Sequence, residues 1–149
     1  MRLKEERIKM SDCIFCKIIK KEISAEIIYE NDDILAILDI QPRTAGHTMV
    51  LPKFHAENIL EVPDEKIAAV FSGVKKITAL LEKSLNPDGF TIGINHGRVS
   101  GQEIAHLHIH IMPRWHNDGG GAIHNVVNNP PKESLEEILK PFFDLIEHL

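Results

Sequence analysis

Residues 106–110 read His-Leu-His-Ile-His and are the strongest indication of chemistry in the sequence. Because successive side chains of a β-strand point to opposite faces, a strand would place His106, His108 and His110 on one face. The aliphatic residues between them would then pack into the core. At about 3.3 Å per residue the outer two imidazoles would lie roughly 13 Å apart, so one metal ion could bind two neighbours but hardly all three. The three histidines are therefore predicted to have different roles, and at least one of them is expected to take part in a reaction.

A segment with two glycines, Asn95-His96-Gly97-Arg98-Val99-Ser100-Gly101-Gln102, leads into this row. Gly97 and Gly101 allow backbone geometries that other residues resist, and they let a ligand approach main-chain N–H groups closely. The segment predicts an anion site beside the histidines. The alternative is an ordinary connection between two strands.

Two cysteines, Cys13 and Cys16, are spaced so that one helical turn would direct both to the same side. In that arrangement they could hold one side of a tetrahedral zinc ion, with His55 and His106 as candidates for the other two ligands. Redox pairs share this spacing, and two buried thiols that happen to be close would look the same in sequence.

Asp39 and His47 lie at the end of one expected strand and the start of the next. Asp39 could accept a hydrogen bond from a ribose hydroxyl, although Asp is also a common turn residue. His47 alone predicts a hydrogen-bonded, half-buried histidine. The remaining histidines are expected in solvent: His96, His116, His124 and His148.

Composition narrows the classes of partner. The chain of 149 residues has a formal net charge of −5, which argues against nucleic acid as a general partner, because phosphate contacts need clustered Lys and Arg. No apolar run approaches the roughly 20 residues of a membrane span. The first ten residues are charged and lack the apolar core of a signal peptide, so a cytoplasmic protein is predicted. In a reducing compartment the two cysteines are expected as thiols or metal ligands.

The elements that must position these residues follow from hydrophobic patterning. One domain is expected over residues 12–149, with a C-terminal loop and helix, after a poorly packed extension over residues 1–11. Strands are predicted at residues 27–29, 34–39, 47–51 and 90–94, with the histidine row as the fifth. Strands with short connections and two main helices indicate an α+β fold with a largely antiparallel five-stranded sheet.

The first main helix is predicted from Pro63 to about Ser84, and its apolar stripe is expected to be core. The stripe consists of Ile67, Val70, Phe71, Val74, Ile77, Leu80 and Leu81. A short helix over residues 13–20 is expected to be capped by Asp12. The last helix begins near Ser134, where Ser134 and Glu137 have the spacing of a capping box.

Residues 106–112, His-Leu-His-Ile-His-Ile-Met, match the His-φ-His-φ-His-φ-φ signature of the histidine triad (HIT) superfamily. Other segments resemble its prokaryotic, Hint-like branch and occur in the expected order between about Cys13 and Trp115. They are residues 13–19, 39–42, 46–53, 95–102 and 113–114.

The resemblance implies a HIT-like fold and a nucleotide hydrolase or transferase that acts at an α-phosphate through a nucleotidyl-histidine intermediate. His108, the middle histidine, would be the nucleophile, because a neutral imidazole nitrogen can attack when the other ring nitrogen is held. His110 would contact the phosphate and assist the leaving group. The uridylyltransferase branch has Gln at this third position, so His110 makes water the expected acceptor.

The resemblance also implies the binding residues and the assembly. Asn95 and Gln102 would position phosphate and leaving-group atoms, Gly101 would offer a backbone donor, and Asp39 would hold the ribose of a purine nucleotide. A homodimer is implied, with the two sheets continuous across the interface. Zinc-carrying members imply a structural zinc, and the chemistry itself would need no cofactor. The zinc ligands would be Cys13, Cys16, His55 and His106.

Two departures bear on the substrate. Phosphoramidase relatives often have Ser where this chain has Glu103, and a carboxylate that pointed inward would repel a phosphate. Residues 113–115, Pro-Arg-Trp, together with residues 117–119 resemble branches that act on dinucleoside polyphosphates. Adenosine phosphoramidate, other purine nucleotide conjugates and diadenosine polyphosphates are therefore all candidate substrates.

Three classes of function remain. The first is the HIT nucleotide hydrolase. The second is a zinc hydrolase in which two histidines of the row bind a catalytic metal, since His-x-His on a strand is a good metal pair. The third is a non-catalytic nucleotide-binding or scaffold protein, which would bind nucleotides without turning them over.

Overall fold

The structure, a computed structural model, describes residues 12–146 and 148–149. The chain divides into two compact units, the first ending at Gly119 and the second running from Gly120 to Leu149. The extension predicted for residues 1–11 lies outside the described residues, and the single domain over residues 12–149 stays a prediction.

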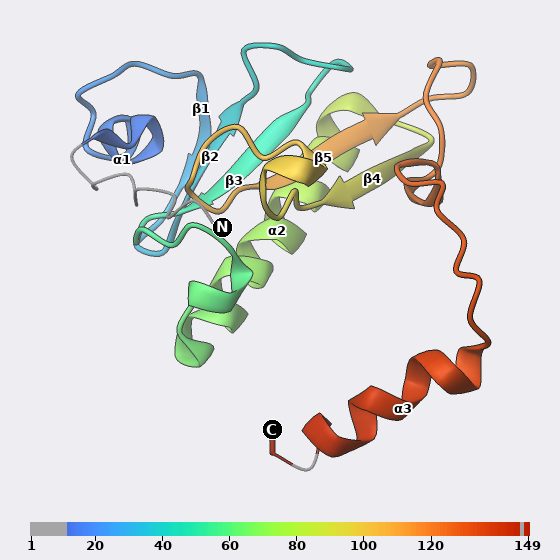
Figure 1. Cartoon of the computed structure of the whole chain (residues 1–149). Coiled ribbons are helices and arrows are strands. Elements are labelled where there is room, and N and C mark those ends of the chain that lie inside the picture. Colours follow the sequence, from blue (N-terminus) through green and yellow to red (C-terminus); the bar gives the residue numbers. More distant parts are fainter. Residues whose placement is uncertain (1–11, 147) are drawn as a thin grey trace. The chain divides into compact units, whose positions relative to one another are not determined.

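The first unit is built on one antiparallel sheet of five strands, as predicted (Figure 1). The strands are β1 (Ile27–Glu30), β2 (Ile34–Leu38), β3 (Thr48–Pro52), β4 (Gly89–Gly93) and β5 (Ile109–Arg114). Their spatial order is β1-β2-β3-β5-β4, so the strand that ends the histidine row lies between β3 and β4. Every neighbouring pair is antiparallel.

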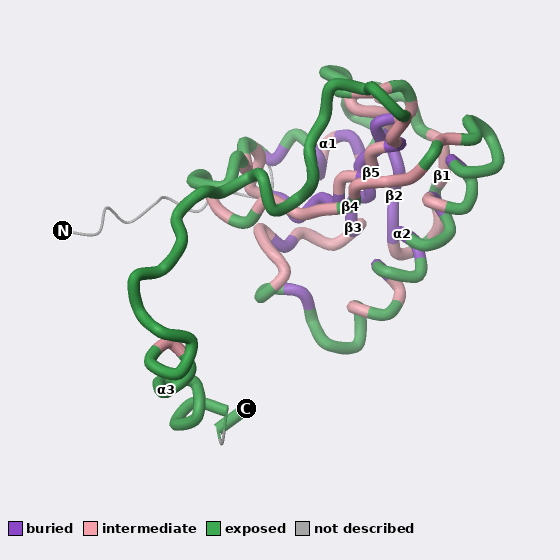
Figure 2. The backbone as a smooth tube through the Cα atoms, turned by 90° about the vertical axis from the view of Figure 1, so that its right-hand side faces the viewer, coloured by how far each residue is buried: buried purple, intermediate pink, exposed green. Residues whose placement is uncertain are grey.

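Strands β2 and β3 are buried on both faces, which explains their nearly continuous apolar sequence (Figure 2). Alternate residues of β2 enter different cores. Ile34 and Ala36 pack in the core of helix α2 (Asp64–Leu85), whereas Leu35 and Ile37 pack in the core of helix α1 (Ile14–Ile19). The two helices therefore cover opposite faces of the sheet.

Helix α2 follows the predicted periodicity with a narrower buried stripe. Val70, Val74, Ile77 and Leu81 are buried, but Phe71 and Leu80 are each 40% exposed in the single chain. The sequence pattern could not separate these two groups, because all of them are apolar and share one side of the helix.

Helix α1 begins one residue later than predicted, and its cap differs accordingly. Cys13, and not Asp12, is the N-cap residue, and its Sγ accepts the Cys16 N–H at 3.4 Å. The cap holds the backbone in the geometry that directs both cysteines inward, where they are buried.

The histidine row only partly lies in a strand. Strand β5 begins at Ile109, so His106 and His108 precede it. The register that pairs Val50 with Ile109 would bring Pro52 opposite Leu107, and proline has no N–H for the ladder. The Leu107 N–H donates instead to the Ala56 carbonyl at 2.6 Å. The alternation nevertheless persists, because Leu107 and Ile109 lie in the α2 core.

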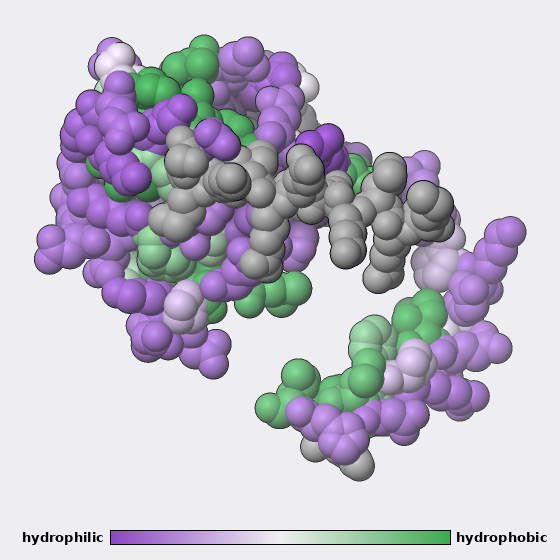
Figure 3. Space-filling view, turned by 60° about the vertical axis from the view of Figure 1, so that its left-hand side comes forward, coloured by the Kyte–Doolittle hydropathy of each residue, from purple (hydrophilic) through white to green (hydrophobic). Residues whose placement is uncertain are grey.

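The second unit contains helix α3 (Leu135–Ile146). The predicted capping box is confirmed: Ser134 N–H donates to Glu137 Oε2 at 2.8 Å, and Glu137 N–H donates to Ser134 Oγ at 3.2 Å. Apolar side chains gather along one side of α3 (Figure 3), and those of Leu139 and Phe142 are 46% and 50% exposed. No helix among the described residues combines the length and the apolarity needed to cross a membrane.

The turn between β2 and β3 depends on Gly46, which has φ +78°. A Cβ at this position would be strained by the backbone and would collide with the Leu85 side chain. We expect Gly46→Ala to lower the free energy of unfolding in urea by about 1–2 kcal/mol. Gly89→Ala is the matched control, because nothing lies within 4 Å of its added Cβ. Equal stability of the two variants would contradict this account of the turn.

Candidate functional site

A cleft of about 500 Å³ in the first unit is lined by most of the residues predicted to bind or act on a nucleotide. Its apolar lining comes mainly from helix α1 and strand β2, through residues such as Phe15 and Ile37. Its polar lining includes the predicted site residues Asp39, Asn95, Gly101, His108 and His110, together with His47. The cleft thus joins an apolar region to a group of histidines.

His108 is held in one tautomer by its neighbour. Its Nδ1 lies 2.7 Å from the His106 carbonyl oxygen, which can only accept, so Nδ1 carries the proton. The free lone pair is therefore on Nε2. Burial lowers the pKa of His108 below its usual value, and the ring is neutral at pH 7. A neutral imidazole with a free Nε2 is the form that can attack phosphorus.

His110 is set in the opposite tautomer by a chain of two hydrogen bonds. The Arg43 backbone N–H donates to His47 Nδ1 at 3.2 Å, so a neutral His47 carries its proton on Nε2. His47 Nε2 lies 2.9 Å from His110 Nδ1 and donates to it. His110 consequently carries its own proton on Nε2 and can donate it to a ligand. Burial, with smaller contributions from His108 and His47, lowers the pKa of His110 to about 4.

His47 is hydrogen-bonded as predicted, but its contact with His110 was not predicted from the sequence. It is buried, 5% exposed, rather than half-buried. Strand register could have revealed it: His110 pairs with Met49, and His47 lies two residues before Met49 on the same face. That argument needs the pairing of β3 with β5, which are far apart in sequence and have no local signal.

The four predicted zinc ligands come together at the start of the histidine row. Cys16 Sγ lies 3.3 Å from His55 Nδ1, and His106 Nδ1 lies 3.5 Å from Cys13 Sγ and 3.6 Å from Cys16 Sγ. All four ligand atoms lie within 4.8 Å of one another. A tetrahedral zinc with bond lengths of about 2.3 Å to sulfur and 2.0–2.1 Å to nitrogen has S···N edges of about 3.6 Å. The cluster therefore fits zinc.

The protonation pattern of the cluster agrees with this fit. His106 Nε2 donates to the Pro52 carbonyl at 2.9 Å, so the Nδ1 lone pair faces the sulfurs. A backbone carbonyl on the second ring nitrogen is the usual partner of a metal-binding histidine. Burial, followed by the hydrogen bond and charge of Cys13, raises the pKa of the Cys16 thiol to about 11. A bound cation would supply the charge that stabilises buried thiolates.

A second group, formed by Asp39, His47 and His110, is close enough to be considered for a metal. The ring nitrogens of this group are already engaged in hydrogen bonds within the protein. A metal on His47 Nε2 would require the proton on Nδ1, where the Arg43 N–H already donates. A metal on His110 Nδ1 would displace the hydrogen bond from His47 Nε2, so these contacts do not favour a metal at this group.

Three predicted binding residues are engaged in local hydrogen bonds. Gln102 accepts the Gly97 N–H at 2.8 Å, and its amide donates to the carbonyls of Glu57 and Ile104 at 2.7 and 3.0 Å. The Gly101 N–H donates to the Arg98 carbonyl at 3.0 Å. One oxygen of Asp39 accepts a backbone N–H at 2.8 Å. The roles predicted for Gln102, Gly101 and Asp39 toward a nucleotide stay predictions.

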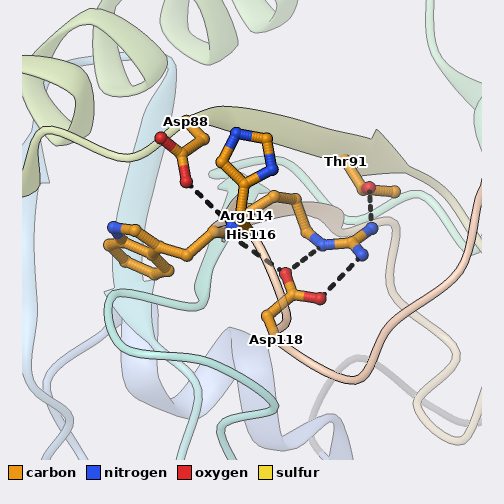
Figure 4. Close-up of polar contacts among 6 residues, drawn as sticks. Asp88, Thr91, Arg114, His116 and Asp118 are labelled. Carbon is orange, nitrogen blue, oxygen red and sulfur yellow. Dashed lines mark hydrogen bonds and ion pairs between the residues drawn. The ribbon is translucent and has the colours of Figure 1, made fainter.

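A polar cluster at the end of β5 anchors the strand that carries His110 (Figure 4). The Arg114 guanidinium donates to both oxygens of Asp118, at 2.6 and 2.9 Å, and to Thr91 Oγ1 on β4 at 2.9 Å. The Asp88 carboxylate accepts the His116 backbone N–H at 2.8 Å. The Arg114 guanidinium thus binds a protein carboxylate and a hydroxyl, and it ties the end of β5 to β4.

The lowered pKa of His110 predicts a pH dependence of stability. The unfolded ring takes up a proton near pH 6.5, whereas the native ring does so only near pH 4. Between these values protons bind the unfolded state more strongly, so the free energy of unfolding falls as the pH drops from about 6.5 to about 4. We expect His110→Asn to flatten this decline in urea titrations. An unchanged slope, equal to that of the exposed-site control His116→Asn, would contradict it.

Comparison with known proteins places this site in a family. The HIT domain model matches residues 20–117. An uncharacterized HIT-like protein of Methanocaldococcus jannaschii is 48% identical over 128 residues, which cover 86% of this chain and 96% of that protein. The adenosine 5'-monophosphoramidase of Schizosaccharomyces pombe is 39% identical over 108 residues, covering 72% of this chain and 78% of the relative.

Solved structures agree with the sequence comparisons. The crystal structure of a HIT family member from Bacillus subtilis has a TM-score of 0.81 at 36% identity, covering 93% of this chain and 97% of the other. The fold, the histidine row and the family match over most of the first unit lead to one conclusion: the chain belongs to the HIT domain family.

Proposed function

We propose that the protein is a nucleotide hydrolase that acts at an α-phosphate through a nucleotidyl-histidine intermediate. One observation carries the proposal: His108 presents a free Nε2 lone pair beside His110, whose Nε2 carries a proton. The two rings lie with their centroids 4.9 Å apart in the same cleft. A nucleophile and a hydrogen-bond donor are thus supplied by adjacent neutral imidazoles.

The reaction would take place in two displacements. His108 Nε2 attacks the α-phosphorus, the bond from phosphorus to the leaving group breaks, and the leaving group takes a proton from solvent while the His110 Nε2–H donates a hydrogen bond to it. Water then attacks the phosphorus, the bond to His108 breaks, and the proton of that water is released to solvent. His47 would keep the His110 Nε2–H in place as a donor through their 2.9 Å hydrogen bond.

The nucleoside would occupy the apolar region of the cleft, where Phe15 and Ile37 offer a surface for a purine. Asp39 would hold the ribose with its carboxylate at the edge of that region. Asn95 would position the phosphate, and Gly101 could contribute its N–H if it exchanged its bond to Arg98.

The proposed substrates are adenosine phosphoramidate and related purine nucleotide conjugates. The relative in Schizosaccharomyces pombe, named for adenosine 5'-monophosphoramidase activity, supports this choice. Diadenosine polyphosphates are the alternative. Their support came from the segment around Arg114, but its guanidinium is engaged by Asp118 and Thr91. A non-catalytic nucleotide-binding scaffold is the second alternative.

We also propose that Cys13, Cys16, His55 and His106 hold a structural zinc ion. When bound, zinc would supply folding energy and not a reactive site, because four protein ligands close its tetrahedron. His106 would then be fixed from its side chain, while its carbonyl holds His108 at 2.7 Å. The zinc cluster would position the nucleophile without touching the substrate.

We further propose a homodimer. Strand β4 lies at one edge of the sheet, and Ile92 on it is 40% exposed, as are Phe71 and Leu80 on α2. An unpaired strand edge and exposed apolar side chains favour association of two copies. We expect light scattering at micromolar concentration to give twice the chain mass, and a monomeric mass would contradict the dimer.

The hydrolase proposal is tested by turnover of a panel of nucleotides. Adenosine phosphoramidate, diadenosine tetraphosphate and a nucleotide sugar are incubated with the protein, and AMP release is followed. We expect the phosphoramidate to have the highest kcat/KM. A preference for diadenosine tetraphosphate would support the first alternative, and tight binding without turnover of any compound would support the scaffold.

A further inference from the structure

Glu103 is an acidic side chain that lines the cleft and has no role in the proposed mechanism. It lies in the connection between β4 and β5, and Asn95, Gly101 and His108 line the same cleft. Its side chain is exposed, and no hydrogen bond or ion pair to its carboxylate occurs among residues 12–146 and 148–149. This carboxylate is therefore available to a ligand.

The backbone around Glu103 is held in place. On one side, the Gln102 amide is held by hydrogen bonds to Gly97 and Glu57 at 2.8 and 2.7 Å. On the other side, the Ile104 carbonyl accepts from Gln102 Nε2 at 3.0 Å and from the His106 N–H at 2.9 Å. Glu103 consequently lies in a segment whose backbone is fixed by hydrogen bonds, next to the start of the histidine row.

The cleft lining offers few positive charges that could neutralise the Glu103 carboxylate. His110, with its pKa lowered to about 4 by burial, is neutral at pH 7. Asp39 is the other acidic residue of the lining, and one of its oxygens already accepts a backbone N–H. Arg43 is the cation among the described lining residues, and it follows Asp39 in the connection between β2 and β3.

The lining also indicates which part of a substrate meets Glu103. A purine needs apolar surface, which helix α1 provides through Ile14, Phe15 and Ile18. The α-phosphorus must lie at His108 Nε2. The leaving group would then lie on the side of the cleft formed by the connection between β4 and β5, which contains Glu103.

We propose that Glu103 selects substrates by the charge of their leaving group. Conjugates of AMP with an amine that carries a second, positively charged ammonium group would be favoured, and conjugates whose leaving group is an anion would be disfavoured. This inference rests on the proposed hydrolase function. Two unit charges about 6 Å apart, in surroundings between water and protein interior, change a rate constant by roughly 5–10-fold.

The test uses three conjugates of AMP that have the same P–N linkage and similar size. Their amines are ethylenediamine, propylamine and β-alanine, so the far end of the leaving group is cationic, neutral or anionic at pH 7. AMP release gives kcat/KM for each, and the readout is the ratio of the charged conjugates to the neutral one. Raising the salt concentration should move both ratios toward unity, because exposed charges are screened.

We expect Glu103→Gln to lower the cationic-to-neutral ratio about 5–10-fold and to raise the anionic-to-neutral ratio by a similar factor. Glu103→Lys should reverse the order of the charged conjugates. Glu82→Gln, on the exposed surface of α2, makes the same change in net charge outside the cleft and should leave both ratios within about twofold of wild type.

The outcomes separate this inference from the function on which it rests. If the wild type cleaves the conjugates and Glu103→Gln or Glu103→Lys leaves the ratios unchanged, Glu103 does not select charge, although the hydrolase stands. If all variants including Glu82→Gln shift equally, the effect is one of net charge, and the role of Glu103 is refuted. If the wild type releases AMP from none of the conjugates, the proposed hydrolysis and the role of Glu103 both fail.

Discussion

Replacing His108 with alanine should lower kcat for AMP release by roughly 10⁴-fold or more, because a covalent mechanism loses its nucleophile. Nucleotide binding should remain measurable, since the apolar lining and the polar residues of the cleft other than His108 are unchanged. Single-turnover kinetics would give the rate, and calorimetric titration with AMP would give the affinity.

The matched control is His124→Ala, which removes an exposed imidazole of the second unit. It should retain the wild-type rate. A His108→Ala variant that folds, binds AMP and still turns over within about tenfold of wild type would show that another group attacks the phosphorus.

Removing the metal cluster should produce the second large effect, on stability. Apparent binding energies of structural zinc are about 10 kcal/mol or more and add to folding, so Cys16→Ser should lose zinc and melt at least about 10 °C lower. Elemental analysis of protein purified without chelator or metal-affinity resin should give about one zinc per chain for the wild type. Calorimetry or circular dichroism would give the melting temperatures.

Two further variants test whether the effect is specific to the metal cluster. His55→Asn should behave like Cys16→Ser because it removes another ligand of the same cluster, whereas His124→Asn should keep both the zinc and the melting temperature. Clearly substoichiometric zinc in the wild type that added zinc does not raise would mean that the four residues are not a metal site.

Local patterns in the sequence were enough for the fold. Hydrophobic patterning predicted four strands and both main helices, and it predicted the fifth strand in part, because apolar residues mark the buried faces of each element. The pattern could not tell that Phe71 and Leu80 stay exposed, since exposure depends on which part of the stripe meets the sheet. It also gave the wrong cap for α1, where a cysteine replaces the more usual Asp12.

The sequence predicted those parts of the site whose residues are close together in the chain. It did not predict contacts that depend on the pairing of strands distant in sequence. The histidine row and the cysteine pair were visible because their spacing is short. The contact of His47 with His110 could be recognised only from the pairing of β3 with β5. Its 2.9 Å hydrogen bond joins the residue before β3 to a residue of β5. The local bonds of Gly101 and Gln102 were equally hidden, since a sequence does not show which polar groups a loop uses for itself.

The central claim is that His108 Nε2 becomes covalently bonded to the nucleotide. The most direct measurement is rapid mixing with an AMP conjugate, quenching in alkali to preserve the phosphorus–nitrogen bond, and peptide mass spectrometry. The account predicts an AMP adduct on His108 in the wild type that rises and decays with turnover and is absent from His108→Ala. An adduct on a different residue, or turnover at full rate with no adduct at any time, would contradict it.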